Sequence, residues 1–219
     1  MKAWITFEKK PRLRHIGHLD LMRAMQRALR KSDLPICFSK GFNPHLQLTF
    51  AAPLSVGMYG LREVMEVPLE GDVTAKEVMD KLSRALPPEL PCVSVRMVDD
   101  KHPAPMALLR AADFDIELLE NADAMRAAVP GFLAQSEIIA LRKTKKGEAP
   151  CDIRPMIYNL LVTPEGHLRA VLALCETATC KPDLLLQALS DYAGLPEKPR
   201  TLIARTQLYG KQFAPLETL

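Results

Sequence analysis

Apolar and polar residues alternate in several short segments of the chain, and each of these segments is predicted to be a β-strand. In the first one, residues 3–8, the side chains of Ala3, Ile5 and Phe7 fall on one side, which is the two-residue period of a half-buried strand. The same reasoning predicts further strands at 36–39, 46–50, 64–69, 92–98, 114–118, 137–142, 156–162, 168–174 and 201–208.

Helical periodicity separates these strands. Residues 18–31 place Leu21, Met25 and Leu29 on one face, at the spacing of an amphipathic helix. A capping box, Thr74-Ala75-Lys76-Glu77, opens a second helix, because the serine or threonine and the glutamate of such a box satisfy each other's backbone N–H groups. Two more helices are predicted at 121–129 and 182–193.

The order of these elements indicates an α+β fold made of two similar units. Each unit contains the order β-α-β-β-α-β with an extra strand in the middle, so the prediction is two tandem ferredoxin-like (βαββαβ) units with antiparallel sheets. The proline-rich segment His102-Pro103-Ala104-Pro105 is interpreted as the linker. The expected domains are residues 1–105, which include a basic first helix, and residues 106–219.

Positive charge is concentrated at the start of the chain. The 219 residues have a formal net charge of +3, but residues 1–40 contain ten lysines and arginines against three acidic residues. This asymmetry favours a polyanion or an acidic protein surface as partner, and a solvated helix face is the simpler alternative. No apolar run is long enough to span a membrane, and the first apolar stretch is too short for a signal peptide. A cytoplasmic protein without membrane contact is therefore expected.

The five cysteines predict neither a disulfide framework nor a metal centre. Their number is odd and no C-x-x-C pair occurs, so a zinc knuckle and a radical-generating iron–sulfur cluster are not indicated. Signatures such as G-x-x-x-x-G-K-[ST] and G-x-S-x-G are also missing. The sequence therefore predicts no cofactor and no metal, and it favours a non-catalytic protein over an enzyme.

The first candidate segment lies at the start of the first helix, where unpaired N–H groups attract anions. Arg12, Arg14 and the two imidazoles, His15 and His18, are predicted to form an anion cradle there. Three alternatives stay open for the polar residues of this segment. They are a metal site, at a spacing unlike that of helical zinc sites, a histidine general base that cuts RNA, and a structural role in capping and packing. The residues that would carry any catalysis are His15, His18 and Asp20.

The second candidate segment, Ser39–His45, is a loop punctuated by glycine and Asn-Pro. Its polar candidates for anion binding are Lys40, Asn43 and His45. Phe42 is either an exposed stacking platform or a buried anchor, and the buried anchor is the preferred interpretation. In a simple ferredoxin-like topology this loop follows the second strand, away from the N-terminus of the first helix. Whether the two segments form one site is therefore left open.

Further basic residues are predicted to contact phosphate groups, because such contacts depend on charge rather than on base sequence. For the lysine-rich turn, a solvated turn without a ligand is an equal alternative. Some follow one face of the first helix, and others lie on a lysine-rich turn and beside Asp152. Arg154 is expected to be held in a fixed orientation by an ion pair with Asp152. These residues are Arg23, Arg27 and Arg30 on the helix, Lys145 and Lys146 on the turn, and Arg154.

A long stretch of the sequence, residues 17–58, resembles the signature of the radical-SAM-linked (radical-SAM-associated) family, a bacterial domain of unknown function. The resemblance rests on Gly17-His18-Leu19-Asp20 and Gly41-Phe42-Asn43-Pro44-His45, and it continues in the DIRPMIYNL and TLIARTQLYG segments. Members are fused to, or encoded beside, radical SAM proteins, often near ribonuclease and ribosomal-protein genes. The resemblance implies a radical SAM protein as partner and work linked to RNA. The chain departs from the family pattern at residues 58–63, where only Glu63 matches.

Three functional hypotheses follow. The leading one is a non-catalytic accessory protein to a radical SAM enzyme, which binds RNA or presents a substrate through the basic face of residues 9–31. The second is a metal-free RNA-processing or RNA-modifying enzyme that uses His15 or His18. The third is a protein-binding adaptor whose helix arginines meet an acidic partner.

Overall fold

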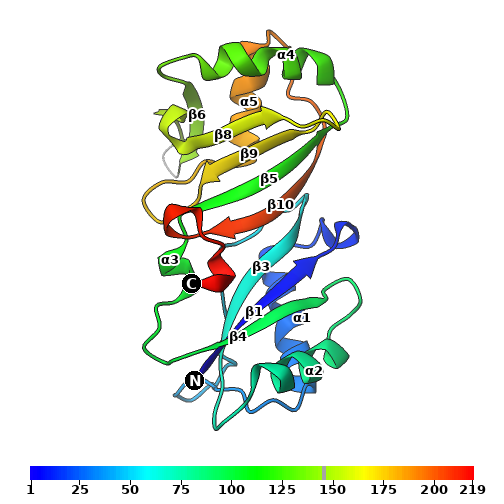
Figure 1. Cartoon of the computed structure of the whole chain (residues 1–219), viewed down its shortest axis with the longest axis vertical. Coiled ribbons are helices and arrows are strands. Elements are labelled where there is room, and N and C mark those ends of the chain that lie inside the picture. The colour runs from blue at the N-terminus through cyan, green and yellow to red at the C-terminus, as the bar shows by residue number, and fades with distance from the viewer. Residues whose placement is uncertain (145–146) are drawn as a thin grey trace. The chain divides into compact units, whose positions relative to one another are not determined.

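The computed structural model describes residues 1–144 and 147–219, and the chain forms two compact units (Figure 1). The first unit contains residues 1–109 and 207–219, and the second contains residues 110–206. Both units combine helices with antiparallel strand pairs, so the predicted α+β class is confirmed. The C-terminal residues belong to the first unit, whereas the sequence analysis assigned them to the second. Glu217 holds them there, because it accepts hydrogen bonds from Arg62 (2.8 Å) and Gln207 (2.8 Å).

The first unit is a helix-covered antiparallel sheet. Its elements are β1 (Lys2–Lys9), η1 (Pro11–Leu13), α1 (His18–Lys31), β2 (Thr49–Phe50), β3 (Met58–Pro68), α2 (Ala75–Ala85), β4 (Cys92–Val98) and α3 (Pro105–Leu108), with η3 (Lys211–Phe213) and η4 (Leu216–Thr218) from the C-terminal segment. The strand order is β4-β1-β3, and β2 pairs with β3. All of these pairings are antiparallel.

The strands around the second candidate segment differ from the prediction. Residues 36–39 form only isolated bridges, and the predicted strand 46–50 is reduced to β2. β3 begins at Met58 rather than at residue 64. Alternation predicts that a segment can be extended, but a strand forms only where a neighbouring strand offers hydrogen-bond partners.

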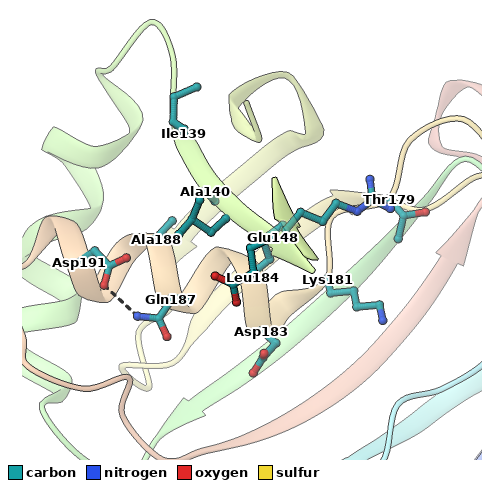
Figure 2. Close-up of a pocket in the computed structure, with 12 residues that line it drawn as sticks. Ile139, Ala140, Glu148, Thr179, Lys181, Asp183, Leu184, Gln187, Ala188 and Asp191 are labelled. Atoms are coloured by element: carbon teal, nitrogen blue, oxygen red, sulfur yellow. Dashed lines mark hydrogen bonds between the residues drawn. The ribbon is translucent and has the colours of Figure 1, made fainter. Parts of the chain in front are cut away.

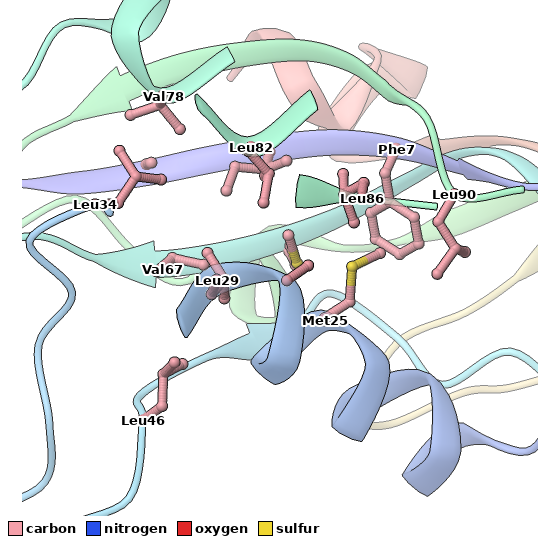
Figure 3. Close-up of a cluster of buried hydrophobic side chains, with 14 of the residues drawn as sticks. Phe7, Met25, Leu29, Leu34, Leu46, Val67, Val78, Leu82, Leu86 and Leu90 are labelled. Carbon is pink, nitrogen blue, oxygen red and sulfur yellow. The ribbon is translucent and has the colours of Figure 1, made fainter. Parts of the chain in front are cut away.

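The core of the first unit lies between the sheet and the two helices α1 and α2 (Figure 3). Phe7 of β1 packs with the predicted apolar face of α1, including Met25 and Leu29. The predicted capping box of α2 is confirmed, since the Thr74 hydroxyl accepts the Glu77 N–H (3.2 Å) and the Glu77 carboxylate accepts the Thr74 N–H (2.8 Å). The helices are therefore positioned by their apolar faces, which leaves their polar faces exposed.

On the other face of this sheet, buried polar groups bind one another around the Glu66 carboxylate. Trp4 is only 1% exposed, and its indole N–H donates to the Glu66 carboxylate (2.9 Å). Lys2 forms an ion pair with the same carboxylate (3.3 Å) and donates to the carbonyl of His102 (2.8 Å). The segment predicted as a linker thus packs on the first unit, with the His102 ring 4.8 Å from that of Trp4.

The second unit has a four-strand arrangement and an added hairpin. Its elements are β5 (Ala111–Leu118), α4 (Ala122–Leu133), β6 (Ile139–Thr144), β7 (Gly147–Asp152), η2 (Arg154–Met156), β8 (Ile157–Val162), β9 (Leu168–Ala173), α5 (Pro182–Tyr192) and β10 (Thr201–Tyr209), whose last residues belong to the first unit. The strand order is β10-β5-β9-β8, and β6 and β7 form a separate two-stranded sheet.

Helix α4 is longer than predicted. It continues through Pro130 to Leu133, although the sequence analysis ended it at residue 129. Packing of Phe132 against Tyr192 of α5, with ring centroids 5.8 Å apart, stabilises this last turn and offsets the hydrogen bond that proline removes. Among the described residues, no helix has the length and apolar character needed to cross a membrane.

Candidate nucleic-acid interface

The loop between β1 and α1 is fixed against the start of β3 by a buried lysine. Lys9 is 1% exposed, and its ammonium donates to the carbonyls of Ile16 (3.0 Å) and Met58 (3.2 Å). The Gly57 N–H donates to the Arg14 carbonyl (2.8 Å). Because a buried ammonium needs hydrogen-bond acceptors, this arrangement holds the first turn of α1 in one place.

At this helix N-terminus, the predicted anion-binding residues interact with protein oxygens. Arg12 lies 3.8 Å from the Glu89 carboxylate, and the Arg14 guanidinium donates to a carbonyl of η1 (3.1 Å). Asp20 forms an ion pair with Arg23 (3.0 Å) and adds negative charge to the first turn. Each exposed interaction is weak, but together they make the N-terminus of α1 a poorer phosphate site than the sequence analysis predicts.

The two histidines of the first segment are in different environments. His15 is exposed, whereas His18 is half-buried with its ring edge-on to that of Phe50, at 5.3 Å between centroids. In the described part of the chain, no hydrogen bond joins these histidines to each other or to Asp20, and no group of three His, Cys, Asp or Glu side chains could hold a metal ion. The contact with Phe50 favours the structural role for His18.

Helix α1 exposes a row of cations on the side away from its core. Arg23, Arg27, Arg30 and Lys31 are all exposed. Arg23 is paired with Asp20, but Arg27, Arg30 and Lys31 form no ion pair with any residue that the structure describes. The C-terminal half of α1 therefore has three uncompensated positive charges within five residues of sequence.

A small hollow of about 190 Å³ lies between this part of α1 and the end of α2. Arg27 and Lys31 stand one helical turn apart on its rim. The other lining residues are small or apolar, namely Ala24, Ala28, Ala85 and Pro87. The hollow thus combines an apolar floor with two positive groups.

The second candidate segment is the tip of a narrow hairpin held by its own hydrogen bonds. The Ser39 hydroxyl lies 2.7 Å from Nδ1 of His45 and accepts the His45 N–H (3.0 Å), and the Ser39 N–H donates to the His45 carbonyl (2.8 Å). Lys40 and Asn43 are exposed at the tip. The interpretation of Phe42 as a buried anchor is wrong, because its relative exposure is 106%.

The structure keeps the two candidate segments apart. The first segment is tied to Met58, where β3 begins, and the second is tied to Pro68, where β3 ends, through the Cys37 N–H (3.0 Å). These points are the two ends of the eleven-residue strand β3, which spans about 33 Å. The hairpin instead follows the C-terminal end of α1, and Leu46 packs in the same core as Leu29 (Figure 3).

In the second unit, Asp152 binds the backbone of Arg154 and not its side chain. The Asp152 carboxylate accepts the backbone N–H groups of Arg154 (2.9 Å) and Ile138 (2.9 Å) rather than the guanidinium. A carboxylate that accepts backbone N–H groups stabilises a short turn more directly than an ion pair between two side chains does. The predicted phosphate contacts Lys145 and Lys146 lie outside the described residues.

The second unit also contains a cavity of about 680 Å³ between β6 and α5 (Figure 2). Its charged lining residues have both signs, namely Arg142 and Lys181 against Glu148, Asp183 and Asp191. The cavity contains none of the described residues that the sequence analysis selected. Such a mixed lining does not favour a phosphate.

Among the thiols, burial separates inert from accessible groups. Burial raises the pKa of Cys92 to about 11 and that of Cys180 to about 12, so both are protonated at neutral pH. The Thr177 hydroxyl, 3.5 Å from Sγ of Cys175, lowers the pKa of that thiol. Nothing in this arrangement adds to the nucleic-acid interface.

Residues 2–182 match a family model, DUF2344, described as an uncharacterized protein conserved in bacteria. The chain belongs to this family. The match includes α1 and the 39–45 hairpin tip. It extends into the second unit as far as the first residue of α5. A comparison with curated proteins finds no match.

Sequence reasoning missed two features of the interface. Lys31 was counted as part of the basic end but was not selected, although its position four residues after Arg27 predicts a shared helix face. Burial of Phe42 was preferred over an exposed stacking role, and the sequence signal against burial was its position between Gly41 and Asn43-Pro44, turn-forming residues that are typical of an exposed loop tip.

Proposed function

We propose that this protein is a non-catalytic accessory protein that binds RNA through the C-terminal half of α1 and the hollow beside it. The observation that carries the proposal is the set of three uncompensated, exposed cations, Arg27, Arg30 and Lys31, at the edge of an apolar hollow. Unpaired cations bind phosphate without first breaking an ion pair, so the released counterions contribute directly to affinity.

The arrangement of the first unit supports this use of α1. The apolar face of the helix is buried against the sheet, and the loop before it is fixed by Lys9. The cationic face is therefore presented on a rigid scaffold, which reduces the entropy lost on binding. A nuclease site has no comparable support, because His18 packs on Phe50 and the nearby Asp20 is paired with Arg23.

We extend the proposal to the fold type of the two units and to the identity of the partner. The order β4-β1-β3 with β2 on β3, and the order β10-β5-β9-β8 once the β6–β7 hairpin is set aside, fit two tandem ferredoxin-like units. A radical SAM protein is proposed as the partner from the sequence resemblance described above, with the RNA or another substrate presented to it in the cytoplasm.

The test is a titration of the purified protein against fluorescently labelled RNA at several salt concentrations, with chelator present. The proposal expects saturable binding that weakens as salt rises, and intact RNA at the end. Absence of binding at low salt contradicts it. Discrete cleavage products that vanish in His15→Ala or His18→Ala would support the enzyme hypothesis instead. A protein partner recovered from cells after nuclease treatment, without RNA, would support the adaptor hypothesis.

A further inference from the structure

We infer that Phe42 is a stacking residue for an unpaired base, so that the RNA bound by α1 is single-stranded at the hairpin tip. This inference rests on the proposed function, since it names the class of RNA that the same surface takes. The starting observation is that Phe42, with a relative exposure of 106%, contacts nothing that would hide its ring from solvent.

The hairpin holds Phe42 in this exposed position. Bridges join Phe38 to Leu46 and Ile36 to Leu69, and the Ser39–His45 hydrogen bonds close the tip. The tip is therefore a defined turn on an anchored base, so the backbone need not rearrange to expose the ring to a ligand.

The neighbours of Phe42 fit a nucleotide better than a purely apolar ligand. Lys40 and Asn43 are exposed on either side of it, and His45 closes the turn. An aromatic ring stacks on any base, while a lysine contacts the backbone phosphate and an amide hydrogen-bonds a base edge. Phe38 lies before the tip, four residues from Phe42 in the chain, and is 46% exposed. It provides a second exposed aromatic surface on the same hairpin.

The base of the hairpin lies close to the C-terminal end of α1, the end that carries the uncompensated cations. The chain leaves α1 at Lys31 and reaches the Ile36–Leu69 bridge five residues later. After the tip it returns to the core at Leu46, which packs in the same cluster as Leu29 (Figure 3). One strand of RNA can therefore place its phosphates along α1 and an unpaired base on Phe42. A duplex cannot do this, because its bases are already stacked and paired.

The experiment compares Phe42→Ala, Phe42→Leu and Phe42→Trp with the wild type, using a labelled 12-nucleotide RNA and the corresponding 12-base-pair duplex. Phe42→Ala and Phe42→Leu should weaken single-strand binding about tenfold and leave duplex binding unchanged. Phe42→Trp should retain binding, and its fluorescence should be quenched when single-stranded RNA is added. The wild type is the fluorescence blank, since its one tryptophan, Trp4, is buried.

Leu141→Ala is the matched control, because Leu141 is also a large exposed apolar residue (63%) but lies in the second unit. It should bind both RNAs like the wild type. If RNA binds the wild type but Phe42→Ala loses nothing and the Phe42→Trp signal does not change, the stacking inference is wrong and the proposed function stands. Equal losses for single strand and duplex also overturn it. If neither RNA binds the wild type at low salt, the proposed function itself fails.

Discussion

Removing the uncompensated cations of α1 should make RNA binding less dependent on salt. The variant is Arg27→Gln/Arg30→Gln/Lys31→Gln, which keeps good helix formers on an exposed face. Each phosphate contact with a single strand contributes a slope of about −0.7 to the plot of log affinity against log salt. Three contacts therefore contribute about 2 units of slope. Arg23 is left in place because it is already paired with Asp20.

This slope converts into a measurable difference in affinity. Between 50 and 200 mM salt, three contacts account for about a twentyfold loss of wild-type affinity that the variant does not show. The assay is fluorescence anisotropy with labelled single-stranded RNA at four or more salt concentrations. Loss of two charges from the last turn of α1 should lower the free energy of unfolding by about 1 kcal/mol, so a melting curve establishes that the variant is folded.

The matched control removes the same net charge elsewhere. Lys101, Lys181 and Lys211 are exposed and form no ion pair within the described residues, and none lies on α1. Their replacement by glutamine should leave the slope nearly unchanged. If the α1 variant keeps the wild-type affinity and slope while folded, or if both triple variants change the slope equally, then the α1 surface is not the phosphate-binding surface and the reasoning is refuted.

Three other predictions test the core, a helix cap and the thiols. Leu29→Ala should lower the free energy of unfolding by about 3 kcal/mol in urea denaturation, because Leu29 is fully buried; a loss below about 1 kcal/mol contradicts the packing of α1. The Glu77 carboxylate accepts hydrogen bonds from Thr74, of which the one from the backbone N–H has the larger effect and the one from the hydroxyl the smaller. Both hold the pKa of Glu77 below its ordinary value of 4.5. The wild type should therefore be more stable than Glu77→Gln above about pH 4.5. This difference in the free energy of unfolding should decrease as the pH falls through the lowered pKa of the folded state, and a difference that grows in acid contradicts the prediction. Iodoacetamide should label Cys175 well before Cys180 in the native protein, as peptide mass spectrometry will show, since the Thr177 hydroxyl lowers the pKa of the first thiol and burial raises that of the second to about 12.

The sequence alone determined the features that depend on residues close together in the chain. The apolar face of α1 and the capping box of α2 involve spacings of three or four residues, so the pattern identified both correctly. The concentration of basic residues before residue 40 and their spacing along α1 were equally visible. Each of these depends on local geometry, which the sequence specifies directly.

Only the tertiary structure decided which of those residues are available. Asp20 pairs with Arg23, and Asp152 accepts a backbone N–H rather than the Arg154 guanidinium. Phe42 is exposed at the tip of a hairpin. The base of this hairpin is fixed by a bridge between Ile36 and Leu69, which lie more than thirty positions apart in the chain. Exposure and pairing depend on which distant segments meet, and periodicity within one segment contains no information about its partners.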